Sequence, residues 1–273
     1  MKINSKNIKD TYYNDIIILL SGSGVSHIIP ILCTPLLTRL YSPDHFGQFG
    51  LYLSLIGLFS IISSGRYHLA ILLPEKDEEA DTLKTISLLF NIVFCIFLYI
   101  LIYLGSYFTF LSFIYSSLGQ LIYILPLGTL FFSFFDIINY SLNRKKQYNN
   151  MKNIRIFRSL TSQSSSIFMG LSSLGLTGLV LGHMFGNIIP SIMNAKEINC
   201  NVNNNDIKKT AIKYSEFPFY QMPTSILNTF SNQAPIYFFT AFFSLKVVGF
   251  YALAQRLFSI PIGLMSASVS QVF

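Results

Sequence analysis

Charged residues are scarce in this chain of 273 residues, because only 11% are Asp, Glu, Lys or Arg, whereas 52% are hydrophobic and 15% are aromatic. So little charge excludes an ordinary water-soluble domain. Cysteine is scarce too. Cys33, Cys95 and Cys200 are scattered without metal-ligand spacing, so they indicate neither a metal site nor a disulfide framework.

The motifs of common enzyme classes are also absent. The chain has no Walker A loop, so we expect no ATP-driven transport by this chain alone. It has no GxSxG, no HExxH and no Cys/His cluster, and the connections expected outside the cell are too short to hold a catalytic domain. We therefore expect a protein that is not an enzyme and that uses no metal and no cofactor.

Long apolar stretches are abundant instead. Each is about the length that crosses a hydrocarbon core of ~30 Å as a helix. The eight stretches are Ile16–Leu37, Gln48–Ser64, Thr85–Tyr107, Leu121–Ser141, Phe157–Leu174, Leu176–Ala195, Phe219–Phe243 and Phe250–Phe273. They predict an all-α polytopic membrane protein with about eight transmembrane helices.

Basic residues are concentrated at the N-terminus and in every second gap between these stretches. The fourth gap is the most basic and holds Arg144, Lys145, Lys146, Lys152, Arg155 and Arg158. Because loops rich in Lys and Arg stay in the cytosol, we expect the N-terminus and the basic gaps to be cytosolic. The net charge of +7 then reflects membrane topology, and we expect no nucleic-acid partner.

The first two stretches resemble the last two. Ser26–Ile31 (SHIIPI) aligns with Ser231–Ile236 (SNQAPI), and Phe46–Phe49 (FGQF) aligns with Val248–Tyr251 (VGFY). An even number of spans separates the copies, so both have the same orientation, as in transporters built from parallel repeats. We therefore predict a six-helix bundle over residues 1–200 and the first two helices of a second, incomplete bundle over residues 201–273.

Several longer motifs resemble the oligosaccharide flippases of O-antigen and capsule assembly. These motifs are Leu36–Gly47 (LLTRLYSPDHFG), Ser64–Pro74 (SGRYHLAILLP), Asp77–Ala80 (DEEA), Phe217–Tyr220 (FPFY) with Pro223, and Gly249–Leu257 (GFYALAQRL). The resemblance runs through essentially the whole chain. It places the chain in the wider superfamily of multidrug antiporters, oligosaccharide flippases and the peptidoglycan lipid flippase.

This resemblance implies two six-helix bundles around a cavity that opens alternately to each side of the bacterial inner membrane. The implied cargo and partner is an oligosaccharide repeat unit linked to undecaprenyl diphosphate, used for O-antigen, lipopolysaccharide or capsule synthesis. Membrane lipids, the glycan polymerase and the chain-length machinery are further candidate partners. Such flippases have twelve or more spans, so the chain is expected to be C-terminally truncated, and an inactive truncated product is one alternative.

Moving a diphosphate-linked glycan requires cationic groups within a polar path, because desolvating charge and hydroxyls is costly. Arg256 is the best candidate, since it lies about two turns inside the last span, and the resemblance aligns it with an arginine thought to engage the diphosphate. Arg66 and Arg39, near the ends of the second and first spans, are candidate gates. All three can instead be interfacial anchors, with Arg39 also able to pair with Asp44.

Polar residues in the fifth and seventh spans are candidates for contacts with sugar hydroxyls. Gln163, Ser166 and Gly170 are spaced to share one helical face, which can line the cargo path or can pack against a neighbouring helix. Asn228 and Gln233 lie in a span that contains prolines, which favour a kinked helix beside a cavity.

Three residues are candidates for proton coupling. Asp136 is the only acidic residue inside a predicted span, and a pairing with Arg144 two turns later is the alternative. His27 and His183 lie in mid-span, where neutral histidines that bond between helices are the more common case. A cation-coupled drug antiporter of the same superfamily is the alternative function, but it would need acidic cavity residues. A membrane-bound enzyme of glycan assembly is a further, weaker alternative.

Overall fold

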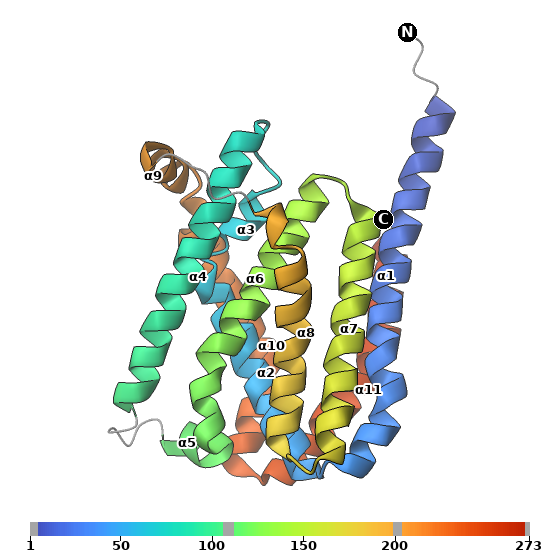
Figure 1. The fold of residues 1–273 in the computed structure, drawn as a ribbon, viewed down its shortest axis with the longest axis vertical. Coiled ribbons are helices and arrows are strands. Elements are labelled where there is room, and N and C mark those ends of the chain that lie inside the picture. Colours follow the sequence, from blue (N-terminus) through green and yellow to red (C-terminus); the bar gives the residue numbers. More distant parts are fainter. Residues whose placement is uncertain (1–4, 106–111, 199–203, 271–273) are drawn as a thin grey trace.

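The computed structural model describes residues 5–105, 112–198 and 204–270, and every regular element in these ranges is helical (Figure 1). The elements are α1 (Ser5–Leu40), α2 (Pro43–Ser63), α3 (Tyr67–Ala70), α4 (Asp77–Gly105), α5 (Ser112–Leu118), η2 (Gly119–Ile124), α6 (Leu125–Arg144), α7 (Tyr148–Leu171), α8 (Leu176–Met193), η3 (Ala195–Glu197), α9 (Asn204–Lys213), the π-helix η4 (Phe217–Gln221), α10 (Met222–Phe242) and α11 (Leu245–Ser270). The all-α prediction is confirmed.

Each predicted apolar stretch overlaps one long helix. Within the described residues, four segments are long and apolar enough to cross a membrane, namely Pro43–Ser63, Asp77–Gly105, Tyr115–Arg144 and Leu176–Met193. Helices α7 and α10 carry more polar residues, and the stretches at the two ends include side chains outside the described part. For these four helices, crossing the membrane stays a prediction.

The long helices lie side by side, with α4 along one edge of the molecule (Figure 1). The outer face of α4 carries exposed apolar side chains, including Val93 at 65% exposure and Ile96 and Phe97 at 57% each. A contiguous apolar face of this size is unfavourable in water and suits contact with lipid. The exposed apolar face of α4 and the composition of the chain therefore both indicate a membrane protein.

Helix α2 begins where the sequence signals a helix start. Ser42 precedes it in an extended conformation and its hydroxyl accepts a hydrogen bond of 3.3 Å from the backbone N–H of His45. Pro43 occupies the first turn, where no backbone N–H is needed, and Asp44 follows near the positive end of the helix dipole. This start fixes the position at which α2 meets α11.

The two copies of the repeat meet through Gly47 on α2 and Gly249 on α11, two residues that the repeat aligns. A carbon placed on Gly47 would collide with the Leu245 carbonyl, and one placed on Gly249 would collide with the Pro43 carbonyl. Pro43 and Leu245 are also equivalent in the alignment, so the contact is reciprocal. A two-fold relation between the copies requires this reciprocity. The division at residue 200 stays a prediction.

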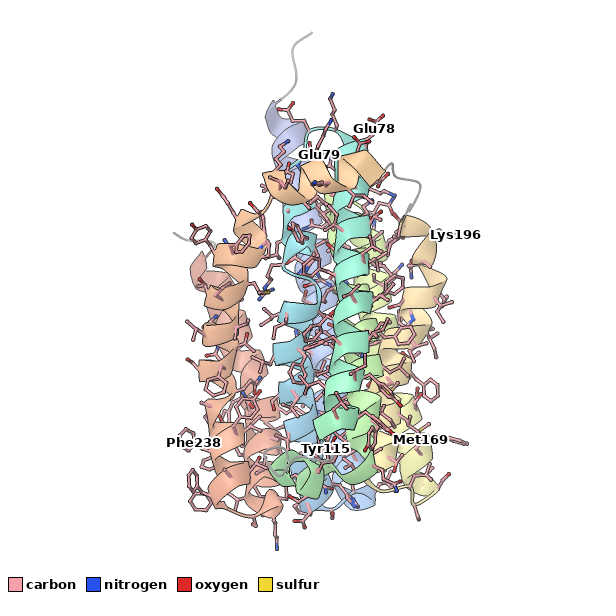
Figure 2. The ribbon with its side chains drawn as sticks, turned by 90° about the vertical axis from the view of Figure 1, so that its left-hand side faces the viewer. Glu78, Glu79, Tyr115, Met169, Lys196 and Phe238 are labelled. Carbon is pink, nitrogen blue, oxygen red and sulfur yellow. The ribbon has the colours of Figure 1, made fainter. Side chains whose placement is uncertain are left out.

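Charged side chains gather at one end of the molecule, named the basic end, where α4 and α7 begin and α6 ends. Glu78, Glu79 and Lys196 lie toward this end, whereas Tyr115, Met169 and Phe238 lie toward the other (Figure 2). The short helix α9 lies at this end and packs against α4 (Figure 1). Its Ala211 carbonyl accepts a hydrogen bond from the Tyr67 hydroxyl of α3 at 3.1 Å.

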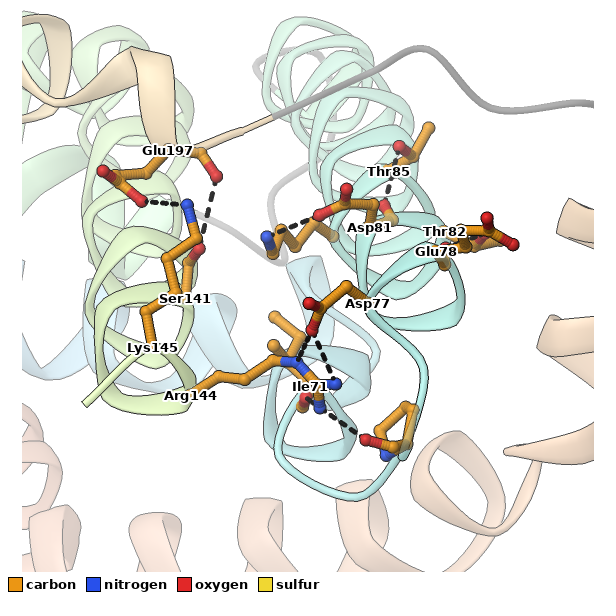
Figure 3. Close-up of polar contacts among 12 residues, drawn as sticks. Ile71, Asp77, Glu78, Asp81, Thr82, Thr85, Ser141, Arg144, Lys145 and Glu197 are labelled. Atoms are coloured by element: carbon orange, nitrogen blue, oxygen red, sulfur yellow. Dashed lines mark hydrogen bonds and ion pairs between the residues drawn. The ribbon is translucent and has the colours of Figure 1, made fainter. Parts of the chain in front are cut away.

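Ion pairs link the connections at the basic end (Figure 3). Arg144 at the end of α6 pairs with Asp77 at 3.0 Å, and its Nη1 also donates to the carbonyls of Ile71 and Pro74 at 3.0 and 2.6 Å. Lys145 pairs with Glu197 at 2.6 Å. Arg144 thus attaches the segment between α3 and α4 to the end of α6, and Lys145 attaches η3 to the same end.

Helix α9 is held to α4 by Lys213, which pairs with Glu79. The hydrogen bond to Glu79 raises the pKa of the Lys213 ammonium, with smaller contributions from the nearby charges. Both side chains reach solvent, so screening keeps this contribution to stability small.

Candidate functional site

A cavity of about 620 Å³, named the first cavity, lies among α1, α6, α7 and the turn that follows α2. Its wall is mostly polar and charged. The lining residues are Ser23, Ser26, His27, Pro30, Arg66, His68, Phe135, Asp136, Asn139, Tyr140, Asn143, Met151, Arg155, Arg158, Ser159, Ser162 and Gln163.

Helix α7 places two arginines on this wall. Arg155 and Arg158 are three residues apart, so they share one helical face. Arg155 donates from Nε to Asn139 Oδ1 at 3.1 Å and from Nη1 to Ser23 Oγ at 3.0 Å. The Arg158 guanidinium lies over the Phe135 ring, 4.4 Å from its centroid. Stacking holds this cation in place without using its N–H donors.

A third arginine enters the cavity from the turn between α2 and α3. Arg66 has φ of 58° and follows Gly65 at φ of 52°, so two successive residues adopt the left-handed conformation. A bulky residue rarely adopts this conformation, which costs free energy and often marks a functional position. Arg66 Nε is buried and has no hydrogen-bond partner within the described ranges.

Proline shapes the cavity wall on α1. Pro30 has no N–H, so the Ser26 carbonyl loses its normal helical partner. Ser159 on α7 replaces that partner by donating its hydroxyl to the Ser26 carbonyl at 2.8 Å. This bond joins α1 to α7 beside the cavity.

Asp136 on α6 is the carboxylate that faces these arginines. It interacts electrostatically with Arg158, Arg66 and Arg155. The four ion pairs found among the described residues all lie elsewhere, so Asp136 shares its charge among the three cations without a direct pair. Three guanidinium groups and one carboxylate give the wall an excess of positive charge.

A second cavity of about 430 Å³ adjoins the first, and both are lined by His27, Pro30, Ser162 and Gln163. It lies among α1, α2, α7, α8, α10 and α11, so it extends the polar space toward the second copy of the repeat. Its further lining residues are Phe46, Phe49, Gly50, Leu53, Ser54, His183, Gln233, Ile236, Ala252, Leu253, Gln255 and Arg256.

Arg256 reaches across the second cavity from α11. Its Nη2 donates to Gln163 Oε1 on α7 at 2.8 Å and to the Pro30 carbonyl on α1 at 2.9 Å. The same residues, Pro30 and Gln163, also line the first cavity. Arg256 therefore lies at the junction of the two cavities and joins the second repeat copy to the first.

His183 and Gln233 contribute polar atoms to the second cavity. The His183 ring is surrounded by the rings of Phe49, Tyr52 and Phe132, with centroid distances of 6.1–6.2 Å. The Nδ1 atom of His183 and the Oε1 atom of Gln233 are buried without a hydrogen-bond partner in the described part of the chain. Such atoms require water or a ligand, because an unsatisfied buried polar atom is costly.

The structure thus brings together most of the residues predicted for the site. Arg66, Asp136, His27 and Gln163 line the first cavity, and Arg256, Gln233 and His183 line the second together with His27 and Gln163.

Arg39, Asn228 and Ser166 line neither cavity. Arg39 and Asn228 are exposed, and Ser166 is buried where α7 packs on α8. The Ser166 carbonyl accepts a hydrogen bond from Tyr41 at 2.6 Å. Of the two alternatives for this residue, the structure supports helix packing, because Gly182 on α8 closely approaches Ser166.

The alternative pairing of Asp136 with Arg144 is also wrong. Arg144 points away from the site, toward Asp77 and the carbonyls between α3 and α4. Asp136 therefore interacts with the arginines of the first cavity and not with Arg144.

Arg155 and Arg158 were missed as site residues, because they were assigned to a basic connection. Helix α7 begins at Tyr148, well before the predicted start at Phe157. The overlooked signal is the spacing of Arg155, Arg158, Ser159 and Ser162, which continues one polar face into the serine-rich span.

The family of polysaccharide biosynthesis proteins matches residues 36–273 of the chain. The chain belongs to this family. Membership supports a role in polysaccharide biosynthesis or export, in keeping with the resemblance to oligosaccharide flippases. No curated protein and no solved structure matches the chain.

Proposed function

We propose that this polysaccharide biosynthesis protein is a flippase rather than an enzyme. Its proposed cargo is an undecaprenyl-diphosphate-linked oligosaccharide repeat unit, which it moves from the cytosolic to the external leaflet of the bacterial inner membrane. The proposed topology has a cytosolic N-terminus and therefore a cytosolic basic end. The observation that carries this proposal is the first cavity, where Arg66, Arg155 and Arg158 face a single carboxylate.

The composition of the cavity fits an anionic headgroup that bears sugars. Guanidinium groups bind phosphate oxygens through several N–H donors at once, and Asn139, Asn143 and Tyr140 offer hydrogen bonds to hydroxyls on the same wall. The polyprenyl tail can remain in the bilayer, so only the polar headgroup needs the cavity. This arrangement removes most of the desolvation cost.

The adjoining second cavity provides the next polar position along the path. Arg256 is available there for the diphosphate once its bonds to Gln163 and Pro30 open. His27, His183 and Asp136 are proposed carriers of a coupling proton because each lines one or both cavities.

The experiment is a leaflet assay in cells that lack the gene. We expect the lipid-linked repeat unit to accumulate on the cytosolic leaflet, and expression of the protein to reverse this. Arg155→Ala should fail to reverse it, because one cavity cation is lost. Lys246→Ala, which removes an exposed basic residue that lines neither cavity, should behave as the wild type.

If no lipid-linked unit accumulates without the gene, the proposed cargo is wrong. Restored resistance to cationic dyes without any change in the leaflet distribution would instead favour the drug antiporter.

A further inference from the structure

Asp136 is a negative charge in the lining of a site proposed to bind an anion. It lies on the wall of the first cavity and interacts with all three of the arginines there. A cavity evolved only for tight anion binding would gain affinity from a neutral residue at this position, because a carboxylate repels phosphate oxygens. The presence of a carboxylate therefore requires its own explanation.

The other contacts of the arginines show that they do not depend on Asp136 alone. Arg155 is held by Asn139 and Ser23, and Arg158 is stacked on Phe135. The Arg66 backbone lies in the left-handed turn before α3, and its Nε has no hydrogen-bond partner among the described residues. Two of the three cations therefore have a support other than the carboxylate, so holding the arginines together does not by itself explain Asp136.

A transporter has to release what it binds. Passage requires binding that is strong enough to admit the cargo but weak enough to let it leave. Three guanidinium groups around a diphosphate diester, which carries two negative charges, would hold it strongly in a partly dehydrated cavity. One carboxylate among them reduces the net positive charge of the site from three to two, and it repels the phosphate oxygens of the headgroup.

We propose that Asp136 is the release residue of the first cavity. When the cargo is absent, its carboxylate interacts with the three arginines. When the cargo is bound, the carboxylate lowers the affinity of these arginines for the diphosphate. This inference rests on the proposed function, because it takes a diphosphate-linked glycan as the cargo. It assigns a specific task to a residue that a purely attractive site would not contain.

The test measures binding of two probes by the purified protein in lipid nanodiscs. Farnesyl-diphospho-N-acetylglucosamine carries two negative charges, and farnesyl N-acetylglucosaminide is neutral with the same tail and sugar. Asp136→Asn should bind the charged probe about tenfold tighter, the effect expected of one like charge in a partly solvated site. Its affinity for the neutral probe should equal that of the wild type, and Asp136→Glu should match the wild type with both probes.

Transport in proteoliposomes supplies the second measurement. Asp136→Asn should lower KM and kcat together, because the cargo enters readily but leaves slowly. Asp136→Ser serves as a second neutral variant, and binding of the neutral probe shows that each variant is folded.

Equal or weaker binding of the charged probe by both neutral variants overturns the inference and would show that Asp136 only keeps the arginines together. If the wild type itself does not prefer the charged probe, then the proposed function fails instead, so the two failures are distinguishable.

Discussion

Substituting Gly47 with alanine tests the contact between the two repeat copies directly. The new methyl carbon would collide with the Leu245 carbonyl oxygen, and it would lie 2.9 Å from the Leu245 carbonyl carbon and 3.1 Å from the Gly249 nitrogen. All three are backbone atoms, so no side-chain rotation can relieve the collision. Carbon atoms pack at about 3.5–4.0 Å, so α2 and α11 must separate by about 1 Å.

We expect this separation to cost about 1–3 kcal/mol, as for other overpacked interiors. Gly57 on the same helix is the matched control, because a carbon placed there meets nothing within 4 Å. Gly57→Ala should be neutral or should stabilise the protein by about 0.5–1 kcal/mol, since alanine favours a helix more than glycine does.

The assay heats the purified protein in detergent and measures the folded fraction that remains by size-exclusion chromatography. The apparent melting temperature of Gly47→Ala should lie at least about 2 °C below that of Gly57→Ala, given about 2–4 °C per kcal/mol for a chain of this size. Gly249→Ala should resemble Gly47→Ala, and the double variant should cost less than the sum, because one separation of α2 from α11 makes room for both methyl groups. Equal melting temperatures for Gly47→Ala and Gly57→Ala would refute the close approach of the two helices.

Substitutions of Arg144, Ser159 and Arg256 test other contacts. Arg144→Ala should destabilise the protein by about 1.5–3 kcal/mol, because it removes charge-assisted bonds to backbone carbonyls, and Arg144→Lys should recover only part of this in the same unfolding assay. Ser159→Ala should cost about 1–3 kcal/mol by leaving the Ser26 carbonyl without a partner, whereas the exposed Ser164→Ala should change stability by less than about 0.5 kcal/mol. In the leaflet assay, Arg256→Ala should strongly reduce export. Arg256→Lys should retain part of it, because lysine keeps the positive charge but lacks the several guanidinium N–H donors. Full activity of the alanine variant would contradict a role in the path.

Some of the candidate site was predictable from local sequence. Arg256 and Asp136 are indicated because ionisable residues inside apolar stretches are rare and expensive, and Arg66 because it lies just beyond the end of such a stretch. Gln163 is indicated by its place on a polar face of the serine-rich span. For each of these, the signal lies in a few consecutive residues.

Other parts of the site were not predictable in this way. The charges at Arg155 and Arg158 are typical of a connection, because an apolar run ends where charges begin. In the structure the helix includes both arginines, because their side chains face a polar cavity. Whether Ser166 would face that cavity or a neighbouring helix depended on Gly182, a residue of another helix whose approach the sequence does not show.

The sequence by itself determined that this is an all-helical membrane protein, because apolar length and the spacing of basic gaps are local properties of the chain. Only the tertiary structure decided which polar residues meet. The rotation of each helix and the partners of Arg144, Arg155 and Asp136 depend on contacts between helices far apart in the chain. The positive cavity is therefore a property of packing, although each of its charges is visible in the sequence.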